Sequence, residues 1–98
     1  MAYEIRVGRQ AEREIAALRA FDRARIYREI REQLTYEPTV ETSRRKRLIP
    51  TAETAARGVT WELRVGIYRV FYDVDDDRIV VLVVKVAHKG RKTTEEIL

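Results

Sequence analysis

The segment WELRVGIYRVFYDV, residues 61–74, carries the clearest structural pattern in this 98-residue chain. Apolar and polar residues alternate on both sides of Gly66-Ile67, which is typical of two strands that each bury one face. A Gly-X pair between such strands suits a two-residue turn with glycine first. The segment therefore predicts an antiparallel hairpin of Trp61–Val65 and Tyr68–Val74.

This turn also fixes which residues face each other. It places Val65 opposite Tyr68 and Arg64 opposite Arg69. One face of the hairpin is then apolar, and we assign it to the core: Trp61, Leu63, Val65, Tyr68, Val70, Tyr72 and Val74. The other face carries Glu62, Arg64, Arg69, Phe71 and Asp73.

Two arginines directly opposite each other destabilise a hairpin by up to ~1 kcal/mol. Two explanations fit Arg64 and Arg69. Glu62, on the same face, neutralises them, or an anion such as a phosphate binds between them. Both stay open from the residues alone.

The flanking sequence supplies the other elements. Residues 3–7 alternate as a strand, and two amphipathic helices follow, the second from Asp22 to about Tyr36. Residues 39–60 form a basic connection. Residues 78–86 are β-branched and apolar on both faces, which is typical of a central strand.

We therefore expect one small α+β domain over residues 1–98, in the order β-α-α-β-β-β. Its antiparallel sheet has a helical hairpin on one face, and no element remains to cover the other, so that face is open. A three-residue loop at Asp75–Asp77 would place Lys85 on the open face beside Arg69. We prefer that register because an unpaired lysine in the core is costly.

Composition excludes several kinds of chemistry. The absence of cysteine excludes disulfides, cysteine-ligated zinc, iron–sulfur clusters and thiol catalysis. The presence of only one histidine excludes sites that need two imidazoles. The only serine, Ser43, precedes four basic residues and is a poor nucleophile there. With no acidic cluster and no glycine-rich loop, we expect no metal and no cofactor.

The chain also carries no readable signal for export. Glu4 and Arg6 stand where a signal peptide has its apolar region, and the longest apolar run, Ile79–Val84, is too short to cross a bilayer. We expect a cytoplasmic protein that does not bind membranes.

The net charge is +4, and 16 of the 20 basic residues are arginine, whose planar fork binds phosphate at two points. Three basic groups are expected to converge: Arg64 with Arg69, the tail His88–Lys92, and the run Arg44–Arg47. A phosphodiester backbone is the commonest ligand of such a surface. A solvated turn is the alternative for the run, and an ordinary strand end is the alternative for His88.

The run LRVGIYRVFY, followed by a β-branched strand that ends in Ala87-His88-Lys89, resembles the RelE/ParE superfamily of toxins from bacterial type II toxin–antitoxin systems. The resemblance extends over essentially the whole chain. It implies one of two activities. RelE-like members cleave mRNA on the ribosome without a metal, and ParE-like members inhibit DNA gyrase. It also implies a cognate acidic antitoxin that wraps the toxin in a hetero-oligomer.

The resemblance suggests roles for single residues. Arg69 matches an arginine that contacts the scissile phosphate, and Lys89 or Arg91 matches the basic residue after the last strand. His88 lies where several nucleases keep a histidine or basic group, and Glu62 where some members have a base. The remaining candidates would hold RNA: Arg64, Arg91, Lys92, Arg44, Arg45, Lys46 and Arg47.

On the ribonuclease interpretation, Arg69 with Arg64 stabilises the charged transition state, and Lys89 or Arg91 assists the leaving group. We rank His88 above Glu62 as the base, because imidazole exchanges protons near neutral pH and a carboxylate between arginines is a weak base. The tail departs from the family pattern because no aromatic residue follows Tyr72, which leaves the general acid unassigned. A gyrase inhibitor, or a protein that only binds its antitoxin, stays open.

Overall fold

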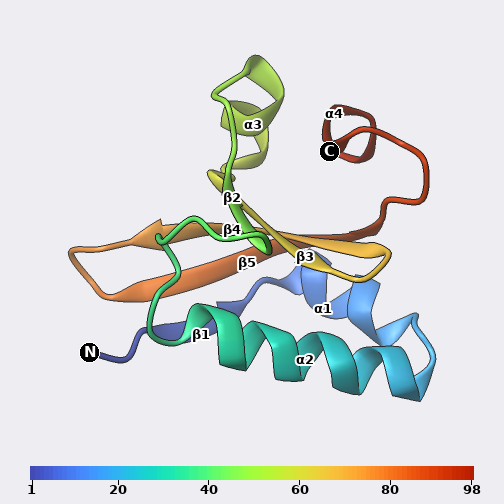
Figure 1. Cartoon of the computed structure of the whole chain (residues 1–98), viewed down its shortest axis with the longest axis horizontal. Coiled ribbons are helices and arrows are strands. Elements are labelled where there is room, and N and C mark those ends of the chain that lie inside the picture. The colour runs from blue at the N-terminus through green and yellow to red at the C-terminus, as the bar shows by residue number, and fades with distance from the viewer.

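A five-stranded sheet in the order β1-β5-β4-β3-β2 forms the centre of the molecule (Figure 1). The computed structural model describes all of residues 1–98. The strands are β1 (Glu4–Val7), β2 (Arg45–Arg47), β3 (Trp61–Val65), β4 (Tyr68–Asp75) and β5 (Val80–His88). The helices are α1 (Arg9–Ala16), α2 (Ala20–Leu34), α3 (Ala52–Arg57) and α4 (Thr94–Ile97). The α+β class predicted from the sequence is confirmed.

The hairpin of β3 and β4 has the predicted register. Val65 pairs with Tyr68, Arg64 with Arg69, and Trp61 with Tyr72. Gly66 has a φ of 58°, in the region that glycine adopts without strain, as the first position of such a turn requires. The turn therefore fixes the parity of both strands.

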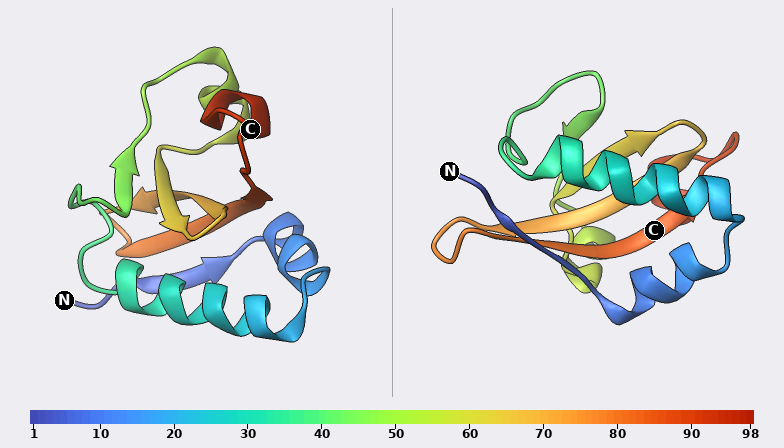
Figure 2. Two further views of the ribbon diagram at one scale, coloured as in Figure 1. Left: turned by 45° about the vertical axis from the view of Figure 1, so that its right-hand side comes forward. Right: turned by 90° about the horizontal axis from the view of Figure 1, so that it is seen from below.

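The main core lies between the sheet and the first two helices, which pack side by side on one face (Figure 2). Ile15 of α1 and Ile26, Ile30 and Leu34 of α2 are buried against the apolar hairpin face. Their spacing places them on one side of each helix. Trp61 and Tyr72 stack with ring centroids 6.2 Å apart.

The sheet is mixed, not purely antiparallel as expected. β1 pairs with β5 in parallel, with Ile5 opposite Val81. No tight turn joins these two strands, so no local pattern of residues indicates their relative direction. β5 is apolar on both faces, as is typical of a central strand. β4 pairs along one of its edges and β1 pairs along the other.

The second face of the sheet is partly covered, which corrects the expectation that it is open. The 39–60 connection contains β2 and α3, and α4 follows β5. A second cluster packs there around the fully buried Phe71: Leu48, Val59, Ile97 and Leu98. Reciprocal side-chain caps at Thr51 and Thr93 start the two short helices.

The loop between β4 and β5 also differs from the expectation. Val74 pairs with Val81, so four residues, Asp76–Ile79, make the turn, and Ile79 has a φ of 57°. A bulge farther along the pair then shifts the register. As a result Lys85 is not beside Arg69. Its Nζ lies 3.9 Å from a carboxylate oxygen of Glu14 in α1.

Replacing Trp61 tests the position of the core. Trp61 is 3% exposed, stacks on Tyr72 and lies 5.7 Å below the Arg47 guanidinium. Trp61→Ala should lower the free energy of unfolding by about 3–5 kcal/mol, through lost burial and the cavity left behind. Chemical denaturation measures this. A change below about 1 kcal/mol would contradict the placement of this face under the helices.

Candidate functional site

The centre of the second face holds a buried ion pair. Arg69 Nε lies 3.7 Å from Glu62 Oε1, with the side chains 13% and 9% exposed. Thr94 of α4 donates its hydroxyl to the same carboxylate at 2.9 Å. Arg69 Nη1 donates to the carbonyls of Gly66 and Tyr68, each at 2.8 Å. The charge of Arg69 is therefore neutralised within the protein, as the first of our two explanations requires.

Arg64, on the neighbouring strand, has a different environment. It is exposed and takes part in none of the seven ion pairs. Its backbone N–H donates to the carbonyl of Arg44 at 2.8 Å, which ties the basic run to β3. Of the two facing arginines, one is held by a carboxylate and the other is free to bind a ligand.

His88 lies away from Arg69. It ends β5 directly opposite Tyr68, and the two rings meet edge to face with centroids 5.8 Å apart. Tyr68 belongs to the main core, whereas Ala87, opposite Arg69, packs in the second cluster. His88 therefore lies on the helix side of the sheet. The structure does not bring the first-ranked base to the face that holds Arg69, and it places Glu62 there instead.

The basic tail, which follows β5, begins beside the β3–β4 turn. The backbone N–H of Lys89 donates to the carbonyl of Ile67 at 2.9 Å, and Lys89 is half-buried. Arg91 and Lys92 are exposed in the link to α4. Lys89 is therefore the tail cation whose backbone is fixed beside the hairpin.

The basic run has four different environments. Arg44 pairs with Glu29 of α2 at 3.2 Å. Lys46 lies opposite Glu62 in the register of β2 and β3, and the two help to line a small cavity of about 100 Å³ with Thr94. Arg47 covers the Trp61 ring. β2 therefore presents one lysine to the Glu62 side of the sheet, and the run is an edge strand, not a flexible turn.

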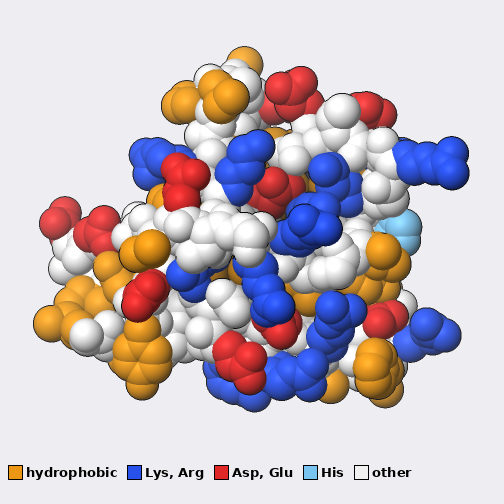
Figure 3. Space-filling model, viewed as in Figure 1, with side chains coloured by type: hydrophobic (Ala, Val, Ile, Leu, Met, Phe, Trp, Pro, Cys, Tyr) orange, Lys and Arg blue, Asp and Glu red, His pale blue; other side chains and the backbone are white.

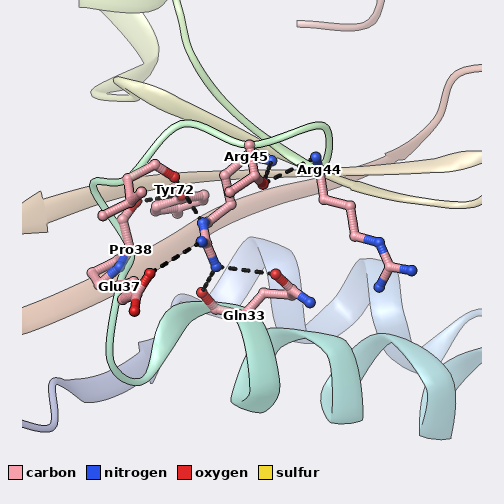
Figure 4. A network of polar contacts seen from close by, with 8 residues as sticks. Gln33, Glu37, Pro38, Arg44, Arg45 and Tyr72 are labelled. Atoms are coloured by element: carbon pink, nitrogen blue, oxygen red, sulfur yellow. Dashed lines mark hydrogen bonds and ion pairs between the residues drawn. The ribbon is translucent and has the colours of Figure 1, made fainter.

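Arg45 is buried, and Figure 4 shows its contacts. Nε donates to the Val40 carbonyl at 2.9 Å, and Nη1 donates to the backbone and side-chain oxygens of Gln33 at 2.7 and 3.0 Å. Beside it, burial raises the pKa of Tyr72, whose protonated hydroxyl donates to the Pro38 carbonyl at 2.7 Å. Because the guanidinium of Arg45 contacts Val40, Gln33 and Glu37, we no longer consider Arg45 a candidate for RNA binding.

Several residues near these groups were not identified as site residues from the sequence. Thr94 contacts Glu62, Asp22 accepts the Tyr68 hydroxyl at 3.0 Å, and Arg25 lies against the hairpin turn. Each comes from an element distant in the chain, so no spacing in the sequence indicates it. No group of three or more histidine, aspartate or glutamate side chains could hold a metal ion. None of the helices has the length and hydropathy needed to cross a membrane.

Solved structures that share this arrangement include two toxin–antitoxin complexes and an isolated toxin. The chain is similar to one in the RelBE2 toxin–antitoxin complex of Mycobacterium tuberculosis, at 26% identity and a TM-score of 0.70, over 90% of this chain and 99% of that one. It is equally similar to a chain in the RelE–RelB complex of Pyrococcus horikoshii, at 26% identity and a TM-score of 0.71, over 93% and 99%. The isolated Escherichia coli RelE toxin shares the fold at 22% identity, with a TM-score of 0.70 over 97% and 93%.

The family follows from the sequence comparison. A family model described as the ParE toxin of type II toxin–antitoxin system, parDE, matches residues 5–93. The chain therefore belongs to the RelE/ParE superfamily and is a toxin of a type II toxin–antitoxin system. A comparison with curated proteins gives no match.

The buried pair makes a prediction about stability. Arg69→Ala leaves Glu62 buried without its cation, so unfolding free energy should fall by about 3 kcal/mol, even though repulsion with Arg64 is relieved. Arg64→Ala, at the exposed partner position, should change it by less than about 0.5 kcal/mol. The double variant Glu62→Gln with Arg69→Gln should recover at least half of the loss. Denaturant titration of the three variants measures this, and a neutral Arg69→Ala would contradict the pairing.

Proposed function

We propose that this toxin is a metal-independent endoribonuclease that cleaves mRNA on the ribosome. One observation carries the proposal. Glu62 and Arg69, the base candidate and the phosphate-binding candidate that the resemblance assigns, lie 3.7 Å apart on one face of the sheet. Lys46 lies opposite Glu62 in the register of the adjacent strand, so a second cation is positioned along the same face.

Each step of RNA cleavage can be assigned to a side chain near this face. Cleavage by 2′-hydroxyl attack needs a group that accepts the hydroxyl proton and cations that stabilise the charge developing on the phosphate. Glu62 would accept the proton, and Arg69 with Lys46 would stabilise the pentavalent phosphate. Lys89, fixed to the hairpin turn, would stabilise the leaving 5′-oxygen. We prefer Glu62 to His88 as the base, because His88 lies on the helix side of the sheet and Glu62 lies beside Arg69.

The α4 helix affects access to this pair. Thr94 bonds Glu62, and Ile97 and Leu98 pack beside Phe71 in the second cluster. Arg69 and Glu62 are therefore largely shielded from solvent in this structure. Substrate binding on this face would require Thr94 to give up its bond to Glu62.

Primer extension on cellular mRNA after induction tests the activity. The wild-type chain should give new cuts that require translation. Arg69→Lys keeps the charge and the ion pair but loses the planar fork, so cleavage should fall by about 10²–10³ with little loss of stability. Arg78→Gln, in the turn between β4 and β5, is the control and should cleave normally. Full cleavage by Arg69→Lys and Glu62→Gln together would overturn this assignment of the site.

Inhibition of DNA gyrase is the second candidate, and two observations favour it. The matching family model is that of the parDE toxin, and the only histidine lies on the opposite side of the sheet from Arg69. A supercoiling assay with purified gyrase distinguishes the two functions. Inhibition of supercoiling with intact mRNA would support this candidate.

We also propose an acidic antitoxin as the partner. The similar structures from M. tuberculosis and P. horikoshii are toxin–antitoxin complexes, and this chain carries a net charge of +4. Exposed cations border the second face from two sides: Lys46 on β2, and Arg91 and Lys92 after β5. An acidic segment that contacts them would cover the candidate site.

Salt dependence tests this partner. Affinity for the cognate antitoxin should fall steadily between about 50 and 500 mM NaCl, because exposed charge pairs are screened. Arg91→Gln with Lys92→Gln should reduce that slope, whereas Arg78→Gln should leave it unchanged. Calorimetry across the salt series measures both. An affinity independent of salt would show an apolar interface instead.

A further inference from the structure

A cluster of arginines lies beside the β3–β4 turn, at the edge of the sheet that faces α2, where Arg64 extends past the end of β2. Arg25 of α2, Arg44 and Arg64 line a cavity of about 260 Å³ whose floor includes Gly66. A shallower groove of about 710 Å³ continues from it past Arg25 and Arg64 to Tyr68 and His88. Because the two share Arg25, Arg64 and Gly66, they form one continuous depression, the hairpin trough.

Arg25 is the central residue of this trough. It is half-buried, makes no side-chain hydrogen bond and takes part in none of the ion pairs. A Cβ on Gly66 would lie 2.8 Å from its Nη1, so the glycine leaves room for the guanidinium to lie over the turn. Partial burial of an unpaired cation costs free energy, which an anionic ligand would offset.

Positive charge predominates along the trough. Its lining includes four arginines, namely Arg19, Arg25, Arg44 and Arg64, and two carboxylates, Asp22 and Glu29. Figure 3 shows lysine and arginine side chains gathered over β3 and the adjacent side of α2. Two cations, Arg25 and Arg64, have no carboxylate partner.

The two carboxylates already have partners in the protein. Glu29 pairs with Arg44 at 3.2 Å. Asp22 accepts the Tyr68 hydroxyl at 3.0 Å and lies 3.9 Å from Arg19. Burial and the bond to Asp22 raise the pKa of Tyr68, so its hydroxyl remains a donor at neutral pH. Neither carboxylate forms an ion pair with Arg25 or Arg64.

One end of the trough offers surfaces that suit a nucleobase. His88 is exposed, and Ile67 beside it is 53% exposed. Cations along a groove with a ring and an apolar side chain at its end are typical of sites for single-stranded nucleic acid. An acidic peptide would use the arginines but would have no need of this ring and apolar surface.

We propose that the hairpin trough binds a single RNA strand, with Arg25 and Arg64 on successive phosphates and His88 against a base. The proposal rests on the ribonuclease function, and it makes His88 an RNA-binding residue and not the base. Arg64 of the trough is opposite Arg69 in the hairpin, so a strand that crosses the β3–β4 turn would reach both the trough and the Glu62–Arg69 pair. Arg44, held by Glu29, borders the far end of the trough.

The test is fluorescence anisotropy with a labelled RNA hexamer carrying 2′-O-methyl groups, which cannot be cleaved by 2′-hydroxyl attack. Arg25→Gln and Arg64→Gln should each weaken binding by about five- to twentyfold and reduce the salt slope by close to one phosphate contact. Arg78→Gln removes the same charge at the acidic loop and is the matched control. His88→Ala should weaken binding without changing the salt slope.

Two results would overturn the proposal. One is equal RNA binding by Arg25→Gln, Arg64→Gln and the Arg78→Gln control. The other is a hexaglutamate peptide whose binding depends on Arg25 and Arg64 while RNA binding does not. Arg64 is exposed, so Arg64→Gln keeps the test valid if Arg25→Gln fails to fold, as thermal melts would show.

Failure of the ribonuclease function gives a different pattern. Intact cellular mRNA together with Arg25-dependent hexamer binding would overturn the ribonuclease proposal alone. Cleaved mRNA together with hexamer binding that ignores both arginines would overturn the trough alone.

Discussion

The two-residue turn at Gly66-Ile67 is the constraint on which the site depends. Because Gly66 accepts a positive φ, β3 and β4 pair with Arg64 opposite Arg69 and Glu62 opposite Phe71. That parity places Trp61 and Tyr72 against the helices and the charged residues on the second face. A slip of one residue would exchange the two faces and bury the arginines.

The hairpin and α2 together provide two kinds of cation. Arg69 is held by Glu62 and by two carbonyls, so it is fixed in place and its charge is compensated. Arg64 and Arg25 are unpaired and line an open depression. Preorganised charge suits stabilisation of a transition state, whereas unpaired charge suits capture of a polyanion. The molecule therefore has one region suited to each task.

Short elements from distant parts of the chain complete the structure around this hairpin. Arg45 uses its guanidinium to hold the segment between α2 and β2, with Tyr72 bonded to Pro38 nearby (Figure 4). Thr94 closes the second face over Glu62. Both contacts are polar, partly buried and satisfied, so each fixes a loop or short helix that has little apolar surface of its own.

The hairpin, its register, the two core helices and the α+β class could all be predicted from the residues, because each depends on local periodicity or on one turn. The same pattern also placed Glu62 and Arg69 on one face. Three features could be seen only in the folded chain: β1 runs parallel to β5, Lys85 turns toward Glu14, and α3 and α4 cover Phe71. These features depend on contacts between segments that no turn connects. The separation of His88 from Arg69 belongs with them, because it follows from a bulge that shifts the register of β5 against β4.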